Sequence, residues 1–251
     1  MRSLKRPGHH RVVEILGNLD AEFLLRAECY FGGGTQIVLA NGEYRESRDI
    51  DFICSSRDGF RILRETVHER SLGRIFRRDM DLARGVRADR DGIRTFIAGD
   101  SSQTPTKFEI VFEARIDVTG TMNGELGIPV LDPESAVAEK LLANVDRGLD
   151  EVFRSRDLVD LAFLARAHGS EILRVGLSKA QTAYGAAVLT YLEKSVRRLG
   201  EDRSYFRKCV NDLTMDDEKG LRQGLRVLRA FLSAVKKAMP PDASKSGKSG
   251  T

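Results

Sequence analysis

The feature that most constrains this chain is a glycine-rich turn that two aspartates, one residue apart, follow at a short distance. The stretch from Tyr30 to Phe52 reads YFGGGTQIVLANGEYRESRDIDF. Glycine lets backbone N–H groups come close to a phosphate, and the apolar run after Thr35 predicts a helix whose N-terminus favours an anion. We therefore expect Gly33, Gly34 and the Thr35 hydroxyl to form a phosphate-binding turn.

The two aspartates predict a cation site. Asp49 and Asp51 alternate with Ile50 and Phe52, so on a β-strand both carboxylates face one way and both apolar side chains face the core. Two converging carboxylates are costly unless a cation neutralises them. Hard oxygen ligands of this kind suit Mg²⁺ or Mn²⁺, which also bind substrate phosphates.

The first half of the chain reads as alternating helices and strands. We expect a strand over residues 28–31 before the glycine turn and a helix from Phe60 to near Gly73. The clearest strand covers residues 106–113, with Phe108 and its apolar neighbours inward and Glu109 on the opposite face. The remaining expectations are short helices around residues 11–17 and 23–25 and a hairpin of strands 86–90 and 93–98 joined at Asp91-Gly92.

Beyond Pro129 and Pro133 the pattern becomes helical. Asp132 or Ser135 is expected to cap the first helix, and a second helix begins near Ser155. Later helices are expected over residues 184–196, 205–213 and 221–235. The predicted domains are a core over residues 1–130, a helical domain over 131–239 and a disordered tail over 240–251, whose composition is mostly proline, glycine, serine and lysine.

Composition favours a soluble, cytoplasmic protein with no membrane partner. Of the 251 residues, 41% are hydrophobic, which supports a real core, and the net charge of +4 tolerates a nucleotide or RNA partner without demanding one. The three cysteines lack CxxC spacing and indicate reduced thiols rather than disulfides or a zinc site. No apolar run approaches eighteen residues, and no signal-peptide segment follows the basic start.

The glycine turn and the aspartate pair together resemble the DNA polymerase β-like nucleotidyltransferase superfamily. That signature is a Gly-Gly or Gly-Ser turn, a helix and then Asp-x-Asp/Glu. The wording GGT followed by RESRDID is similar, more narrowly, to the AbiEii/AbiGii toxin family, which also places Arg45 and Ser47 here. The resemblance spans roughly residues 15–166 and implies an α+β fold: a mixed sheet flanked by helices, followed by a C-terminal helical domain.

The resemblance also implies site residues beyond the first motif. The segment AEKLLANVDRGLDEVFRSRDLVDL is similar to the family's lysine, arginine and Arg-Asp-x-x-Asp-Leu pattern. Lys140 and Arg147 would hold a triphosphate, together with Arg45 and Ser47. Either Asp157 or Asp160 would support the lysine or the reacting group, and the spacing does not choose between them.

Superfamily members carry a third metal-binding carboxylate on a neighbouring strand. Glu109 is the candidate here because it sits in mid-strand, and Glu113 and Asp117 are alternatives. Asp49, Asp51 and Glu109 would then hold Mg²⁺ or Mn²⁺.

The implied function is metal-dependent transfer of a nucleoside monophosphate from a nucleoside triphosphate to an acceptor hydroxyl. The implied setting is a bacterial toxin–antitoxin or abortive-infection system, with an antitoxin partner and, as acceptor, the 3′ end of tRNA or a protein side chain. A small molecule or the enzyme itself are further acceptors. Two rivals are a catalytically inactive RNA-binding or partner-docking module and a metal-dependent phosphohydrolase.

Overall fold

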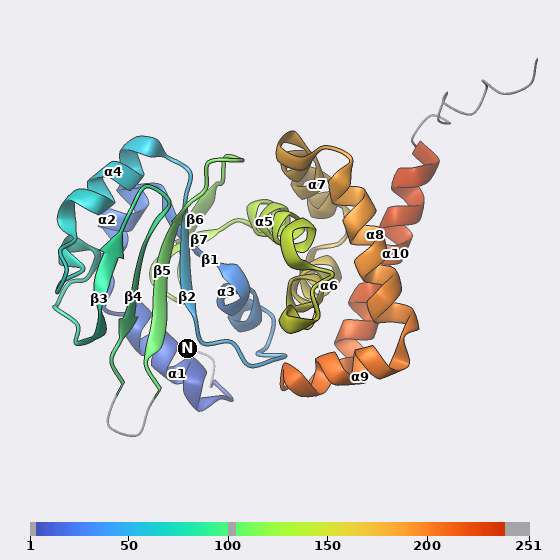
Figure 1. Ribbon diagram of the computed structural model, residues 1–251, viewed down its shortest axis with the longest axis horizontal. Helices are drawn as coiled ribbons and strands as arrows, with labels where there is room; N and C mark the ends of the chain where they lie inside the picture. The colour runs from blue at the N-terminus through green and yellow to red at the C-terminus, as the bar shows by residue number, and fades with distance from the viewer. Residues whose placement is uncertain (1–3, 100–103, 239–251) are drawn as a thin grey trace, which may run out of the picture.

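A mixed β-sheet fills one half of the molecule and a group of helices fills the other (Figure 1). The computed structural model describes residues 4–99 and 104–238, so the tail expected over residues 240–251 lies outside the described residues. The strands are β1 (Cys29–Gly32), β2 (Ile50–Cys54), β3 (Leu82–Ala88), β4 (Gly92–Ile97), β5 (Thr106–Phe112), β6 (Gly120–Asn123) and β7 (Ile128–Leu131).

The sheet order is β3-β4-β5-β2-β1-β7-β6. Strand β2 pairs with β5 in parallel and with β1 in antiparallel, and β1 pairs with β7 in parallel. The aspartate-bearing strand β2 therefore lies at the centre of the sheet. This mixed sheet, with helices on both faces, confirms the expected α+β fold class.

Helices cover both faces of the sheet and then extend to one side of it (Figure 1). Those before the last strand are α1 (Pro7–Leu16), α2 (Ala21–Arg26), α3 (Gly33–Ala40) and α4 (Arg57–Thr66). Those after it are α5 (Pro133–Arg147), α6 (Arg156–His168), α7 (Ser170–Tyr184), α8 (Ala187–Glu201), α9 (Arg203–Asp212) and α10 (Glu218–Ala238). None of the helices in the described ranges combines the length and the apolar composition needed to cross a lipid bilayer.

Strand alternation divides the buried side chains between two hydrophobic cores. Ile50 and Phe52 pack with α1, α2 and α4 in one core, whereas Tyr30 and Ile53 pack with α3 and the C-terminal helices in the other. The side chain of Asp51 therefore faces the second layer of helices, as the period of two predicts. The domain division at residue 130 stays a prediction, because the second core joins both segments.

Helix starts follow the capping chemistry in the sequence. The Asp132 side chain accepts a hydrogen bond from the Ser135 N–H at 2.7 Å, so Asp132 rather than Ser135 is the N-cap of α5. Asp20 caps α2 in the same way, through the Phe23 N–H. These caps fix where α2 and α5 enter the two cores.

The helix expected to run from residue 60 to near Gly73 ends earlier. Helix α4 ends at Thr66, because Val67 adopts an extended conformation and His68 pairs with Ser71 in a short β-bridge. Gly73 has a φ of +53° and packs against the backbone of Thr66, so the chain turns back where the apolar pattern suggested a continuing helix.

Two strands and one α-helix were not expected from the sequence. Strands β6 and β7 form a hairpin where Pro129 suggested a boundary; Pro129 is buried inside β7, opposite Met122. Helix α7 was also missed, and the helix expected over residues 184–196 begins only at Ala187. Tyr184 ends α7 and Gly185, with a φ of +54°, breaks the chain before α8.

Candidate active site

The glycine turn lies directly against the central aspartate. Gly33 has a φ of +69°, and a Cβ placed on it would lie 2.7 Å from Asp51 Oδ2. A Cβ on Gly34 would collide with the Arg45 guanidinium. The two glycines are thus required by the close approach of side chains from β2 and from the loop between α3 and β2.

The carboxylates of the aspartate pair have few partners. Within the described ranges neither Asp49 nor Asp51 accepts a hydrogen bond, and the nearest cation is Lys107, whose Nζ lies 3.9 Å from Asp51 Oδ1. Burial raises the pKa of Asp51, and the neighbouring charges of Asp49 and Glu109 raise it further, although Lys107 acts in the opposite direction. Unused oxygen acceptors on a carboxylate that is costly to ionise fit a hard divalent cation.

Glu109 stands beside the pair but is already neutralised. It lies opposite Asp51 on the parallel neighbour β5, and its carboxylate accepts hydrogen bonds from Arg94 Nε at 2.5 Å and from Lys107 Nζ. Burial raises the pKa of Glu109, but Lys107 and Arg94 outweigh burial and leave the pKa lowered. Accordingly, residues 4–99 and 104–238 contain no group of three His, Cys, Asp or Glu side chains arranged to hold a metal ion.

Neither alternative for the third carboxylate lies opposite Asp51. Glu113 follows directly after β5, is buried and lines the same cavity as Glu109, but its carboxylate accepts two hydrogen bonds from the Arg115 guanidinium. Asp117 is exposed and does not line the cavity described below. Of the three candidates, Glu109 is therefore the one next to Asp51.

Helices α5 and α6 bring a buried ion network over the sheet. Lys140 Nζ lies 2.9 Å from Asp157 Oδ1 and 2.7 Å from Asp160 Oδ2. Arg147 Nε also donates to Asp157, at 2.8 Å. Burial raises the pKa of Asp157, but Lys140 and Arg147 more than offset it and leave Asp157 strongly acidic. The Asp157 carboxylate thus contacts both cations that the resemblance implied, Lys140 and Arg147.

The two aspartates of α6 have different surroundings. Asp157 lines the cavity with Lys140 and Arg147, whereas Asp160 is fully buried behind them. The Asp160 carboxylate accepts hydrogen bonds from Tyr44 Oη at 2.7 Å and from two nitrogens of Arg45 at 2.9 Å each. Asp160 therefore anchors the loop between α3 and β2 to α6.

Four of the expected phosphate contacts do not line this cavity. Thr35 is fully buried and its hydroxyl lies 2.8 Å from Ser47 Oγ. Arg45 is also buried, with donors directed to Asp160 and to the Glu46 carbonyl. Together with Gly34, these residues support the wall behind Gly33. Their direct contact with a nucleotide stays a prediction.

A cavity of about 250 Å³ joins the two halves of the site. It lies between the sheet and helices α5 and α6, and it contains Asp49, Asp51, Lys140 and Arg147 together. Its lining residues are Gly33, Asp49, Asp51, Ile53, Lys107, Glu109, Val111, Glu113, Arg115, Glu139, Lys140, Ala143, Asp146, Arg147, Arg156 and Asp157. The acidic pair, the glycine turn and the lysine helix thus meet at one place.

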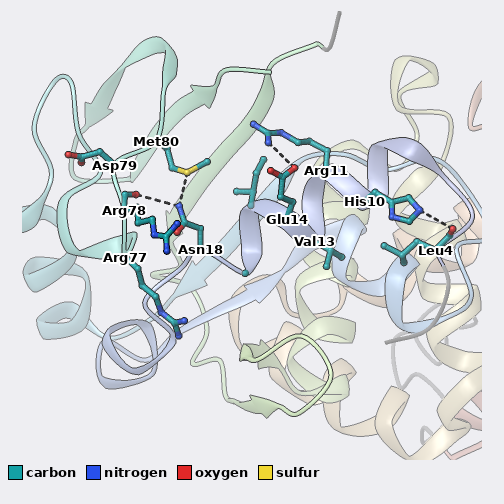
Figure 2. A pocket seen from close by; sticks show the side chains of 12 residues that line it. Leu4, His10, Arg11, Val13, Glu14, Asn18, Arg77, Arg78, Asp79 and Met80 are labelled. Carbon is teal, nitrogen blue, oxygen red and sulfur yellow. Dashed lines mark hydrogen bonds and ion pairs between the residues drawn. The ribbon is translucent and has the colours of Figure 1, made fainter. Parts of the chain in front are cut away.

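A larger cavity of about 720 Å³ lies between α1 and residues 77–80 (Figure 2). Its walls carry Arg11, Glu14, Asn18 and Met80, and several of them bond to one another, as Asn18 Nδ2 does to the Met80 sulfur at 2.8 Å. None of the residues predicted for the site lines this cavity. Its larger volume therefore does not make it a candidate active site.

The sequence interpretation missed two contributors to the site. Lys107 alternates with Glu109 on β5, and that period of two places both side chains beside Asp51. Glu139, one residue before Lys140, carries a buried Oε1 that has no hydrogen-bond partner in the described part of the chain. Burial raises the pKa of Glu139 to about 8, and the neighbouring Glu113 carboxylate adds to the effect. No sequence pattern indicated this second acidic pair.

Comparison with known proteins matches one family model to most of the chain. The sequence model of the family described as nucleotidyl transferase AbiEii toxin, type IV toxin–antitoxin system, matches residues 15–234. The match extends past residue 166, where the resemblance in the sequence ended. No curated protein matches the chain significantly.

Two solved structures share the fold. A candidate nucleotidyltransferase from H. pylori is 17% identical, with a TM-score of 0.53 over 92% of this chain and 96% of that one. JHP933 from Helicobacter pylori is 16% identical, with a TM-score of 0.51 over 94% and 96%. At this level of identity the similarity concerns the fold alone.

Proposed function

Because the chain belongs to the AbiEii family of nucleotidyltransferase toxins of type IV toxin–antitoxin systems, we propose that it moves a nucleoside monophosphate from a nucleoside triphosphate to an acceptor hydroxyl. The acceptor oxygen attacks the α-phosphorus, the bond to the β-phosphate oxygen breaks, and pyrophosphate leaves. The chain is a transferase of the EC 2.7.7 kind. The observation that carries the proposal is that Asp49 and Asp51, which accept no hydrogen bond within the described ranges, lie in one cavity with Lys140 and Arg147.

Asp49 and Asp51 would hold Mg²⁺ or Mn²⁺ in this proposal. Such an ion neutralises charge on the attacking and leaving oxygens of the phosphate. Glu109 joins the set only by exchanging its contacts with Arg94 and Lys107 for the ion. Asp51 supports this role because its charged form is disfavoured by burial until a cation is near.

The chain's cations would position the triphosphate. Lys140 and Arg147, both held by Asp157, face the cavity beside Gly33. We assign them to the β and γ phosphates, with Asp157 fixing their orientation. Positioning and charge neutralisation of this kind supply most of the rate in phosphoryl transfer without a covalent enzyme intermediate.

The finer points of the proposal concern the partners. The acceptor is the 3′ end of tRNA, with a protein side chain as the alternative, and a cognate antitoxin protein completes the pair that the family implies. These substrates place the reaction in the cytoplasm.

The test measures nucleotide transfer directly. Total tRNA is incubated with Mg²⁺ and each of the four triphosphates, labelled at the α-phosphate, and the products are separated by electrophoresis and chromatography. We expect labelled tRNA with the wild-type protein and none with the double variant Asp49→Asn/Asp51→Asn. The control variant Asp58→Asn/Glu171→Gln removes two exposed carboxylates elsewhere and should label tRNA like the wild type. Undiminished transfer by the aspartate variant overturns the proposal, and free nucleoside monophosphate as the only product indicates a hydrolase.

A further inference from the structure

A row of side chains crosses the sheet from its free edge to the aspartate pair. Asp51 on β2 lies opposite Glu109 on β5, which lies opposite Arg94 on β4, which in turn lies opposite Arg87 on β3. Cross-strand partners project from the same face of a sheet. The edge strand β3 therefore shares the face that carries the candidate active site.

A β-bulge turns two arginines of the edge strand toward this face. Arg84 and Arg87 are three residues apart and would point to opposite faces of a regular strand. The register shifts between them, so that Arg84 lies opposite Phe96 and Arg87 lies opposite Arg94. Both arginines are exposed, and neither forms an ion pair within residues 4–99 and 104–238. Two uncompensated charges thus stand on one edge.

These residues line a groove of about 600 Å³ that shares Lys107 with the active-site cavity. The Arg84 guanidinium lies 4.7 Å from the centre of the Phe96 ring, which is half-buried at the groove wall. Glu69 is the one carboxylate among the groove's lining residues. Lys107 lines both the groove and the cavity that holds Asp49 and Asp51. A ligand in the groove can therefore reach the cavity without leaving the protein surface.

We propose that this groove binds the acceptor as a single RNA strand, with its phosphates on Arg84 and Arg87 and a base against Phe96. Neighbouring strands are about 4.8 Å apart, so three steps separate β3 from β2 by about 14 Å. This places a short segment of strand in the groove and its terminal hydroxyl at Asp49 and Asp51. The proposal deepens the nucleotide-transfer function above and rests on it for the direction of the strand.

The chemistry favours a nucleic acid over an acidic protein. Single strands bind proteins through cationic grooves combined with aromatic or guanidinium planes on which bases stack. The groove offers both, since Arg84 and Phe96 already lie in contact. An acidic protein segment would use the charges but would gain nothing from the aromatic face.

The first experiment measures binding of total tRNA to the full-length protein, without triphosphate, as a function of salt. The variant Arg84→Ala/Arg87→Ala should bind more weakly and lower the slope of log K against log salt by about 1.4, at about 0.7 for each lost phosphate contact on a single strand. The control Arg203→Ala/Arg207→Ala removes the same charge from exposed positions of α9, on the far side of the molecule (Figure 1). We expect the control to keep the wild-type slope. Equal slopes for all three proteins overturn the proposal.

The second experiment separates stacking from charge. Phe96→Leu should weaken tRNA binding at least about fivefold without changing the salt slope, because it removes a stacking surface but no cation. Tyr191→Leu is the control, since Tyr191 also lies under a cation, Lys194, but on α8. Unchanged tRNA affinity in Phe96→Leu contradicts RNA binding in this groove. If the affinity of Phe96→Leu is unchanged while Arg84→Ala/Arg87→Ala lowers the salt slope, the groove binds through charge alone, as it would bind an acidic protein.

The outcomes distinguish failure of the groove from failure of the transfer function. If the wild type and Arg84→Ala/Arg87→Ala both label tRNA with the same KM for tRNA, the groove does not bind the acceptor, and the proposed nucleotide transfer is unaffected. If tRNA binds with the expected slope difference but receives no nucleotide, the groove stands and the proposed acceptor reaction is wrong. The KM for the triphosphate should be the same in the wild type, in Arg84→Ala/Arg87→Ala and in Phe96→Leu.

Discussion

Replacing Asp160 by asparagine should destabilise the protein more than any exposed charge change. The substitution keeps the size of the side chain but removes the charge that neutralises two buried cations. Arg45 and Lys140 both lie within 2.9 Å of this carboxylate, and Tyr44 Oη donates to it as well. Asp160 is fully buried, so water cannot replace the missing charge.

The expected size of the effect follows from this burial. Removing one partner of a buried ion pair costs about 3–5 kcal/mol, because the other partner is left as an uncompensated charge. In a protein of this length each kcal/mol corresponds to about 2–4 °C in Tm. We therefore expect the Tm of Asp160→Asn to fall by about 6–20 °C.

The effect should also depend on pH. Burial raises the pKa of Asp160, but Arg45 and Lys140 lower this pKa by more than burial raises it. The pKa of Asp160 therefore lies below the usual value of 3.8. A carboxylate with a lowered folded-state pKa stabilises the fold above its unfolded-state pKa, and this contribution is lost as the pH falls through the folded-state value. The difference between wild type and variant should be complete at neutral pH and should shrink below about pH 4.

Calorimetry and urea unfolding, at neutral pH and below about pH 4, measure the difference in stability between the wild type and Asp160→Asn. Glu171→Gln is the matched control, because Glu171 forms an exposed ion pair with Arg174 and its loss should change the Tm by less than about 2 °C. A Tm for Asp160→Asn within that same range would refute the reasoning, since Arg45 and Lys140 would then not depend on Asp160. Retained transfer by the folded fraction would further assign Asp160 to structure rather than to chemistry.

Two other predictions concern the cavity carboxylates. Glu139→Gln should stabilise the protein at pH 8 but not at pH 4 in urea unfolding: burial raises the pKa of Glu139 from 4.5 to about 8, so the unfolded chain ionises across this window while the folded chain must hold its proton. An equal gain at both pH values contradicts this account. Asp51→Asn should abolish nucleotide transfer yet leave the Tm unchanged or higher, because burial and neighbouring carboxylates disfavour the charge of Asp51. Mg²⁺ at about 100 times its Kd should raise the wild-type Tm by about 5–11 °C and leave the Tm of Asp51→Asn unchanged. An equal Tm shift in both proteins would show that Asp51 does not bind the metal.

The sequence predicted those parts of the fold that depend on local chemistry. The period of two around Asp51 and Glu109 identified both strands and the face that each carboxylate takes. Lys140 and Arg147, which the family resemblance named together, both lie on α5 and line one cavity. Local patterns failed where the chain context overrides them, as in β7, where a buried Pro129 lies inside a strand.

The pairing of charges could not be predicted, because it depends on contacts between distant segments. Arg45 has its carboxylate partner at Asp160, 115 positions later. The sequence assigned Arg45 to the nucleotide, as the family pattern suggests, and gave no sign of this partner. Likewise, Glu109 is a plausible metal ligand by position, but Arg94 reaches it only because β4 pairs with β5 in that register.

The strand order has a consequence for how the chain is made. Strand β1 needs β7 as its parallel neighbour, and β7 ends at Leu131, about a hundred positions after β1 begins. Lys140 and the helix that carries Asp157 leave the ribosome later still. A nascent polypeptide therefore carries both aspartates long before it can enclose them. The proposed nucleotide transfer therefore requires synthesis past α6, so products truncated before α6 should transfer no nucleotide.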